Sequence, residues 1–158
     1  MADRPLAVGD PAPPFEVLDT DGNTVRLADL RGKRVVLYFY PRDNTPGCTT
    51  EACAFRDAYA RFREADVVVL GVSTDDVRSH QKFTQKYALP FPLLADTDAA
   101  IAKAYGVWGE KKFMGRTSMG VKRMTFVIDG EAKISHVFVK VKPETHTAEV
   151  LSALGLAP

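Results

Sequence analysis

Two short runs of β-branched and aromatic residues limit what this chain can fold into more than any other feature. Residues 34–40, rich in Val, Tyr and Phe, form an apolar run that is bounded by Gly32 and Pro41, and residues 66–73 repeat the pattern. Continuous apolar runs of this length are typical of strands that are buried on both faces of a sheet. The sequence therefore predicts a central sheet that other elements cover on both sides.

Helical spacing separates and follows these two strands. A helix over residues 48–63 is predicted from apolar side chains that step by four and three positions along one face, namely Cys48, Ala52, Phe55, Tyr59 and Phe62. Further helices are predicted over residues 77–87, 99–105 and 145–154, the first of them capped by Asp75 or Asp76. Strands that alternate with helices indicate an α/β fold with a mixed β-sheet and helices on both faces.

Two turn signals predict antiparallel pairs of strands. Asp21-Gly22 separates residues 15–18 from residues 24–27, which predicts an N-terminal β-hairpin. Asp129-Gly130 separates residues 125–128 from 134–139, which predicts a second hairpin.

Composition and charge exclude several classes of protein. A chain of 158 residues with 46% hydrophobic and 26% charged residues, and without repeats, fits one globular domain over residues 1–158. A formal net charge of +1 gives no basic field to attract nucleic acid. The longest apolar runs fall far short of the ~20 residues that cross a bilayer, and residues 1–10 lack the apolar stretch of a secretory signal. We therefore expect a cytoplasmic protein without nucleic-acid or membrane partners.

The loop before Cys48 is a favourable place for chemistry. It runs from Tyr40 to Cys48, from the end of a buried strand to the start of a predicted helix. Free backbone N–H groups and the helix dipole at that start favour an anion, so a cysteine there is shifted towards the reactive thiolate. Pro41 fixes the chain as it leaves the strand, and Thr45 can turn its hydroxyl towards the same pocket.

The pattern Pro41-x-x-x-Thr45-x-x-Cys48 resembles the active-site signature of the peroxiredoxins. Cys53, five residues after Cys48, matches the resolving cysteine of the Q-type group, also called bacterioferritin comigratory proteins. The resemblance continues through Gly71-Val72-Ser73, Ser79-His80, Lys86-Tyr87, Leu89-Pro90-Phe91, residues 105–108 and residues 120–129. Ser118 and Met124 depart from the usual pattern of the group, which bears on the rim of the substrate pocket but leaves the signature complete.

This resemblance implies a thioredoxin-like fold and a thiol peroxidase activity that needs no metal or other cofactor. Cys48 would reduce a hydroperoxide and become a sulfenic acid, and Cys53 would then form a disulfide with it. Arg123 matches the arginine that completes the catalytic group and would hold the thiolate, with Thr45 as a further donor. Thioredoxin or glutaredoxin would reduce the disulfide, and the resemblance favours a monomer.

Helix geometry adds a demand of its own to this cycle. Five residues of continuous α-helix give about 7.5 Å of rise and about 140° of rotation, which places the two Cα atoms roughly 8 to 9 Å apart. A disulfide needs Cα atoms within about 7 Å unless the backbone moves. We therefore expect the first turns of the helix to unwind on oxidation.

Other interpretations of the cysteines stay open at this point. Cys48 could be an inert core residue, and Cys53 a chance thiol with resolution left to an external thiol. A zinc site with His80, His136 or His146 lacks the paired spacings that such sites use. A thioredoxin-like disulfide exchanger would share the fold but should carry Cys-x-x-Cys, and a thiol redox sensor would use the same cysteine switch.

Three groups outside the signature are given simpler roles. We interpret His80 as a helix-edge residue that packs or forms hydrogen bonds, not as a base. Glu51 either favours the helix dipole or ties Arg123 to the loop. The basic residues between Lys111 and Lys122 are interpreted as a solvated face.

Overall fold

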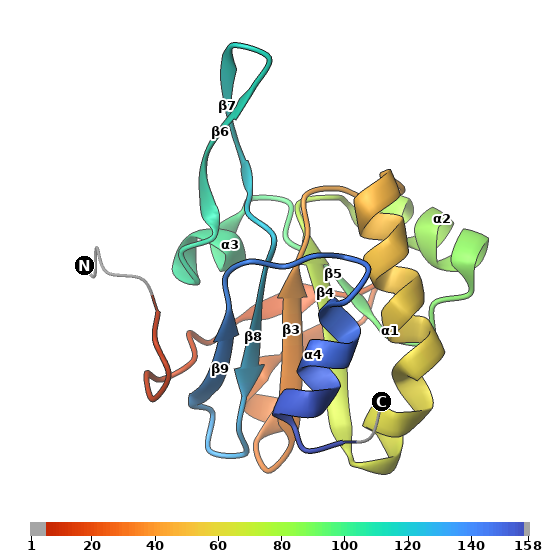
Figure 1. Cartoon of the computed structure of the whole chain (residues 1–158), viewed down its shortest axis with the longest axis vertical. Helices are drawn as coiled ribbons and strands as arrows, with labels where there is room; N and C mark the ends of the chain where they lie inside the picture. Colours follow the sequence, from red (N-terminus) through yellow and green to blue (C-terminus); the bar gives the residue numbers. More distant parts are fainter. Residues whose placement is uncertain (1–5, 157–158) are drawn as a thin grey trace.

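Helices and strands alternate along the chain much as the sequence predicts (Figure 1). The computed structural model describes residues 6–156. The strands are β1 Glu16–Leu18, β2 Thr24–Arg26, β3 Arg34–Phe39, β4 Val67–Ser73, β5 Leu93–Ala95, β6 Trp108–Phe113, β7 Arg116–Val121, β8 Met124–Ile128 and β9 Ile134–Phe138. The helices are α1 Pro46–Glu64, α2 Val77–Tyr87, α3 Ala100–Ala104, α4 His146–Ala153 and the short 3-10 helix η1 Leu27–Leu30.

The central sheet is mixed, as predicted, with the strand order β5-β4-β3-β8-β9. Its first half is parallel, because α1 and α2 cross over between β3, β4 and β5. Its second half is antiparallel, because β8 and β9 form the predicted hairpin beside β3. The carboxylate of Asp129 accepts hydrogen bonds from the N–H groups of Glu131 and Lys133, which closes the hairpin turn.

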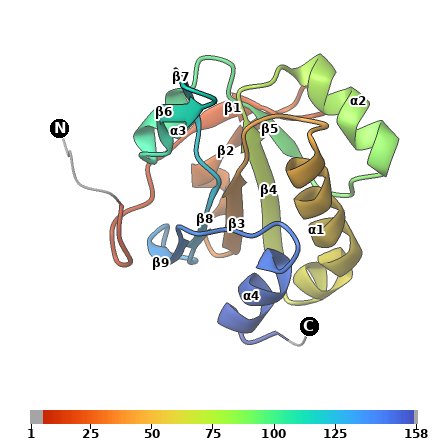
Figure 2. The same cartoon turned by 45° about the horizontal axis from the view of Figure 1, so that its top comes forward.

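Alternate residues of β3 divide the core into two layers. Val36 and Tyr38 face α1, α2 and α4, whereas Val35 and Leu37 belong to the cluster that includes α3 and η1. Figure 2 shows α1, α2 and α4 on one side of the sheet, with α3 and the β1–β2 hairpin on the other. Helices on both faces are thus confirmed, with an unequal division between them. No helix within residues 6–156 is long and apolar enough to span a membrane.

The ends of the helices show how local sequence sets their bounds. Helix α2 begins and ends at the predicted residues, and Asp76 is its cap, because its carboxylate accepts a hydrogen bond from the N–H of Ser79. The prediction that Cys48 opens α1 is wrong by two residues, since the helix begins at Pro46. Proline is suited to the first helical position because it has no N–H to leave unpaired.

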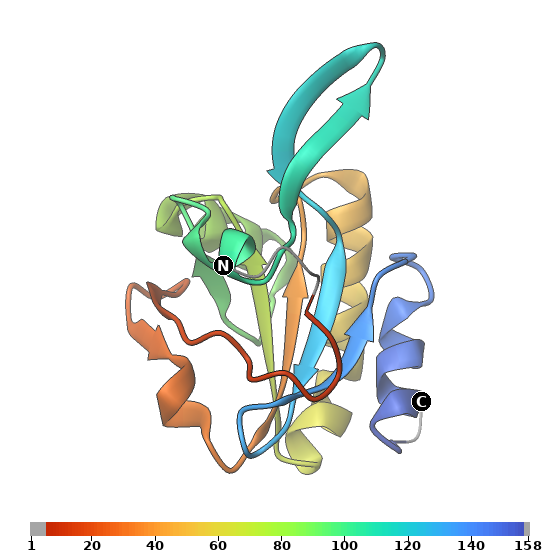
Figure 3. The same ribbon diagram turned by 90° about the vertical axis from the view of Figure 1, so that its left-hand side faces the viewer.

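Three elements of the structure are absent from the sequence prediction. The first is β5, a strand of three residues. The other two are β6 and β7, which pair antiparallel and project from the body of the molecule (Figure 3). Most residues of β7 are exposed, so this hairpin lacks the apolar alternation that marks a half-buried strand.

The N-terminal segment closes part of both edges of the central sheet. Gly9 and Ala12 donate backbone hydrogen bonds to the carbonyls of Ile134 and Ala132, beside the edge strand β9. Further along the chain, the predicted hairpin of β1 and β2 is confirmed, and Asp19 next to it forms a bridge with Leu94 of the other edge strand, β5. Backbone groups that would otherwise be unpaired at the two edges are therefore bonded within the chain.

Candidate active site

The loop between β3 and α1 sets the direction in which α1 begins. The N–H of Tyr40 donates to the carbonyl of Val72, so pairing with β4 continues one residue beyond β3. Pro41 follows, where the chain leaves the sheet, as predicted. Asn44 then adopts a left-handed conformation with a φ of 61°, and Thr45 is the N-cap residue of α1.

Cys48 lies in the first turn of α1 and is buried, with 2% of its surface exposed. N–H groups in the first turn of a helix have no carbonyl partner within the helix, so they and the helix dipole favour a negative charge on this sulfur. The side chain also belongs to the core cluster between the sheet and α1. The thiol is therefore both held in place and electrostatically favoured as a thiolate.

Arg123, in the connection between β7 and β8, reaches the sulfur of Cys48. Its Nη2 atom donates to Sγ of Cys48 over 3.3 Å, and its Nη1 atom donates to Oε1 of Glu51 over 2.7 Å. A Cβ atom on Gly47 would lie 3.2 Å from Nη2, so the absence of a side chain there lets the guanidinium come close to α1. The structure thus brings together two predicted site residues, Cys48 and Arg123.

The charges around Arg123 favour its cationic form. Burial alone would lower the pKa of Arg123, but the neighbouring charges of Cys48 and Glu51 outweigh it and raise the pKa above the ordinary value of 12.5. Because arginine is already cationic throughout the usual pH range, the guanidinium stays a fixed positive charge beside the thiolate.

Glu51 is the partner of Arg123, which realises one of the two roles considered for it. Its side chain is fully buried, and its Oε2 atom has no hydrogen-bond partner among the described residues. Burial raises the pKa of Glu51 from 4.5 to about 7, and the charge and hydrogen bond of Arg123 oppose this only in part. Glu51 therefore holds the guanidinium in place at a cost in stability when it is ionised.

Replacing Glu51 with Gln should change how stability depends on pH. A carboxyl with a pKa raised from 4.5 to about 7 on folding stabilises the folded state below pH 4.5, and that contribution is lost as the pH rises through 7. Relative to the E51Q variant, the wild type should lose about 3 kcal/mol of unfolding free energy over this interval. Urea titrations at pH 4.5, 6 and 8 measure the difference, and parallel curves for the two proteins would contradict the expectation.

Thr45 is placed at the start of α1, but its hydroxyl is bonded to the loop. Oγ1 of Thr45 donates to the carbonyl oxygen of Arg42 over 3.0 Å. This hydrogen bond closes the turn that leads into the helix. The predicted contact of Thr45 with the reacting atoms stays a prediction.

Cys53 lies on the same continuous helix as Cys48 and is half-buried. Both cysteines are free thiols, so the structure is that of the reduced protein. The guanidinium of Arg56, three residues further on, donates to the carbonyl oxygen of Tyr87 at the end of α2 over 2.8 Å. Helix α1 is therefore attached to α2 immediately after Cys53.

Two more side chains near the site were not expected from the sequence. Tyr38 of β3 is buried, and burial, followed by the negative charges of Glu51 and Cys48, raises its pKa well above 10. Lys111 of β6 is interpreted in the sequence as part of a solvated face, but it is half-buried. Burial and the charge of Arg123 lower its pKa, while Cys48 opposes them. The paired hairpin explains this position, which a pattern of local charges does not reveal.

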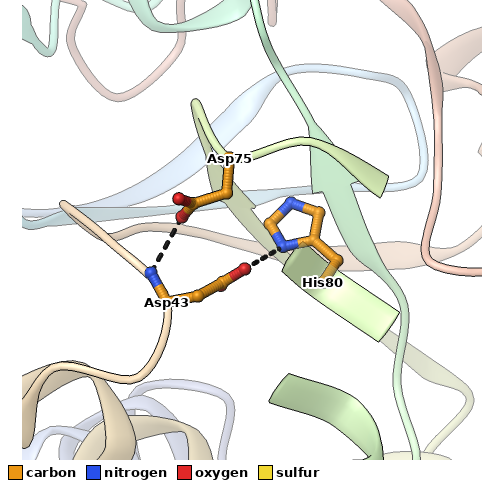
Figure 4. A group of neighbouring side chains, drawn as sticks. All are labelled: Asp43, Asp75 and His80. Carbon is orange, nitrogen blue, oxygen red and sulfur yellow. Dashed lines mark hydrogen bonds and ion pairs between the residues drawn. The ribbon is translucent and has the colours of Figure 1, made fainter. Parts of the chain in front are cut away.

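A cluster of possible metal ligands lies on the other side of the loop. The ligand atoms of Asp43, Asp75 and His80 lie within 4.8 Å of one another, and Figure 4 shows them converging from the loop, the end of β4 and α2. Each of these groups is already hydrogen bonded within the protein. His80 is fully buried in this cluster, so its predicted hydrogen-bonding role is confirmed and its predicted place at the edge of a helix is wrong.

A family comparison agrees with this geometry, because the model of the AhpC/TSA family matches residues 8–137. The chain belongs to the AhpC/TSA family. Among relatives in this family, the putative peroxiredoxin Bcp of Coxiella burnetii is 50% identical over 149 residues, which are 94% of this chain and 99% of that protein. Peroxiredoxin Bcp of Bacillus subtilis is 48% identical over 149 residues, 94% of this chain and 95% of the relative.

Solved structures of the AhpC/TSA relatives share the fold. A crystal structure of a cysteine-to-serine variant of Xylella fastidiosa PrxQ matches with a TM-score of 0.91 and 35% identity, over 96% of this chain and 97% of that one. The bacterioferritin comigratory protein of Xanthomonas campestris matches with a TM-score of 0.85 and 37% identity, over 89% of this chain and 90% of that one. Within the family, this chain is a peroxiredoxin of the Q-type group with a thioredoxin-like fold, and it is a thiol peroxidase.

Proposed function

We propose that Cys48 is the peroxidatic thiol of this enzyme and that Arg123, Thr45 and Pro41 form its site. The observation that carries the proposal is the guanidinium Nη2 atom of Arg123, which lies 3.3 Å from the sulfur of Cys48 in the first turn of a helix. A fixed cation, a helix N-terminus and a buried sulfur together favour a thiolate in a place that excludes bulk water. These are the conditions for nucleophilic attack on a peroxide.

In the first step, the Cys48 thiolate attacks the terminal oxygen of a hydroperoxide and the O–O bond breaks. The electron pair of that bond leaves with the second oxygen, which takes up a proton and departs as water or an alcohol. The sulfur loses two electrons and becomes a sulfenic acid. Arg123, the N–H of Cys48 and the hydroxyl of Thr45 are the donors that would meet the charge on the two oxygens.

In the second step, the Cys53 thiolate attacks the sulfur of the sulfenic acid. A disulfide forms between Cys48 and Cys53, and the hydroxide leaves as water after it takes up a proton. An external dithiol then reduces the disulfide by exchange and is itself oxidised to a disulfide. Thioredoxin or glutaredoxin would serve as that dithiol, and the chain would act as a cytoplasmic monomer.

The substrate class would include hydrogen peroxide and alkyl hydroperoxides. The bacterioferritin comigratory protein of Xanthomonas campestris, which shares the fold, has an alkyl peroxide reduction activity. The same site in this chain would therefore accept an organic group on the leaving oxygen.

One measurement separates a peroxidase from the two other classes of thiol protein. Reduced protein is mixed with an equal amount of hydrogen peroxide, and free thiols are counted over time. A peroxidase loses both thiols rapidly for each peroxide, which supports the proposal. Slow or partial loss would favour a disulfide exchanger or a sensor and would overturn it.

Replacing Cys53 with Ser should separate the two chemical steps. Because Cys53 does not touch the peroxide in the first step, the rate constant for loss of peroxide should change less than about twofold. The sulfenic acid should accumulate and be trapped by dimedone, and turnover with a thioredoxin donor should fall by at least about tenfold. Mass spectrometry of the trapped protein and steady-state turnover check this, and unchanged turnover would show that Cys53 is not the resolving thiol.

A further inference from the structure

Asp43 is the most fully bonded residue of the loop that leads to Cys48. Its Oδ1 atom accepts from the hydroxyl of Tyr40 over 2.6 Å, and its Oδ2 atom accepts from the hydroxyl of Ser79 over 2.8 Å. Its backbone N–H donates to the carboxylate of Asp75 over 2.8 Å. The loop is therefore bonded at this residue to the end of β3, to the end of β4 and to α2.

His80 extends these bonds into the sheet. Its Nδ1 atom lies 2.7 Å from Oδ2 of Asp43, and its Nε2 atom lies 2.9 Å from the carbonyl oxygen of Leu94 in β5. A carbonyl oxygen only accepts hydrogen bonds, so Nε2 carries a proton and donates it to Leu94. Nδ1 and the carboxylate of Asp43 then share one further proton. The fully buried ring thus connects the loop to the backbone of a core strand.

The position of Asp43 controls the start of α1 through the two residues that follow it. Asn44 turns the chain in a left-handed conformation, and Thr45 caps the helix that carries Cys48. A shift of Asp43 would therefore move the first turn of α1 relative to Arg123, which comes from a different part of the chain. Misplacement of reacting groups by about 1 Å can cost on the order of a hundredfold in rate.

The same three side chains could instead be a cation site, but their bonds favour the connecting role. Oδ2 of Asp43 already has two partners, Ser79 and His80. The Oδ2 atom of Asp75 accepts from the N–H of Asp43 and from the hydroxyl of Ser73. A cation would have to displace these donors, and nothing in the arrangement of these described residues leaves an open position for it.

We infer that His80 is a positioning residue for the peroxide reaction, which it assists by holding Asp43 and with it the loop that presents Cys48. The inference rests on the proposed role of Cys48. His80 touches neither the peroxide nor the sulfur in this arrangement. Its loss should slow the attack of the thiolate while the protein remains folded.

The test compares His80→Phe with His80→Gln and with a matched control. Phe keeps the ring volume and removes both hydrogen bonds, whereas Gln keeps one donor. His136→Phe is the control, because His136 on β9 bonds only its neighbour Ser135 through its side chain among the described contacts. Each variant is first checked for a cooperative thermal transition. The rate constant with hydrogen peroxide and the pH profile of Cys48 alkylation by iodoacetamide are then measured in a Cys53→Ser background.

The His80→Phe variant should react with peroxide about tenfold more slowly, with its alkylation profile displaced to higher pH. His80→Gln should fall between that variant and the wild type, and His136→Phe should match the wild type. Rates and profiles within twofold of the wild type in folded His80→Phe would overturn the inference. If that variant does not fold, Asp43→Asn, which retains the shape and one acceptor, must show the slower reaction.

Two further outcomes are assigned in advance. Thermal stabilisation of the wild type by added Zn²⁺ that is lost in His80→Gln would show a cation site and overturn the positioning role. Failure of the proposed function is recognised separately, because the wild type itself would then not lose its thiols to peroxide, whereas the alkylation profile of Cys48 reports on the loop without any peroxide present.

Discussion

An Arg123→Met variant is expected to react with hydrogen peroxide about 10²–10³-fold more slowly than the wild type. Removal of one preplaced donor from a site of developing negative charge typically costs this much in rate. In this enzyme the same side chain also donates to the sulfur of Cys48, so the variant loses a partner of the thiolate as well. Stopped-flow measurement of the first turnover, with Cys53→Ser present in both proteins, isolates the step.

The same substitution should destabilise the protein, because it leaves Glu51 buried without its cation. Removing one partner of a buried ion pair typically costs about 3 to 5 kcal/mol, and we expect about 3 kcal/mol at pH 8. The cost should be much smaller at pH 5, where Glu51, with a pKa of about 7 even beside Arg123, is already protonated. Urea titrations at the two pH values measure the change in unfolding free energy.

The double variant Arg123→Met with Glu51→Gln separates stability from catalysis. The new amide at position 51 carries no charge, so the double variant should regain most of the lost stability at pH 8. Its peroxide rate should stay as low as that of Arg123→Met, because the donor is still missing. Recovery of the rate together with the stability would show that Arg123 acts only by keeping the site folded.

Oxidation to the Cys48–Cys53 disulfide should increase amide exchange of residues 52–55 by at least about a hundredfold. Both cysteines lie on one continuous helix, in which their Cα atoms are too far apart for a bridge. In an α-helix each N–H bonds the carbonyl four residues earlier, so unwinding of residues 48–51 frees the amides of residues 52–55. Hydrogen exchange of reduced and oxidised protein, analysed by NMR, measures this.

The loss of protection should end abruptly along α1. Phe55 is buried against Tyr38, with ring centroids 4.7 Å apart, and Arg56 is bonded to the end of α2. Amides beyond residue 59, whose acceptors follow Phe55, should therefore keep their protection. Reduction with dithiothreitol should restore the exchange rates of residues 52–55. Equal rates in the two redox states would mean that the disulfide forms without unwinding, and the geometric argument would fail.

The parts of the fold that the sequence predicts are those in which a local pattern and the tertiary environment agree. Helix α2 has an amphipathic stripe, a capping Asp76 and a clear end, and its bounds match the structure. The runs that became β3 and β4 are buried on both faces, so their apolar character is continuous. In contrast, β5 has only three residues, and the strands of the β6–β7 hairpin carry lysines, glycines and an exposed methionine instead of an apolar face.

The candidate site was predictable where residues lie close in sequence or match a family signature. Pro41, Thr45 and Cys48 lie within one loop, and Arg123 was found through resemblance, since nothing in its surroundings marks it as a partner of a residue 75 positions away. The bond between Asp43 and His80 joins residues 37 positions apart. Spacing rules describe neighbours on one element, so contacts of this kind follow only from the assembled sheet.

The bonds between the N-terminal segment and the edge strand β9 have a consequence for how the chain folds as it is made. Gly9 and Ala12 leave the ribosome well before their partners, Ile134 and Ala132, which follow more than a hundred positions later. Pairing between such distant segments is slow, because a long loop must close before any contact forms. Residues 9–12 therefore wait without these partners through the synthesis of the rest of the sheet, and the edge at β9 is closed only after β9 itself has been made.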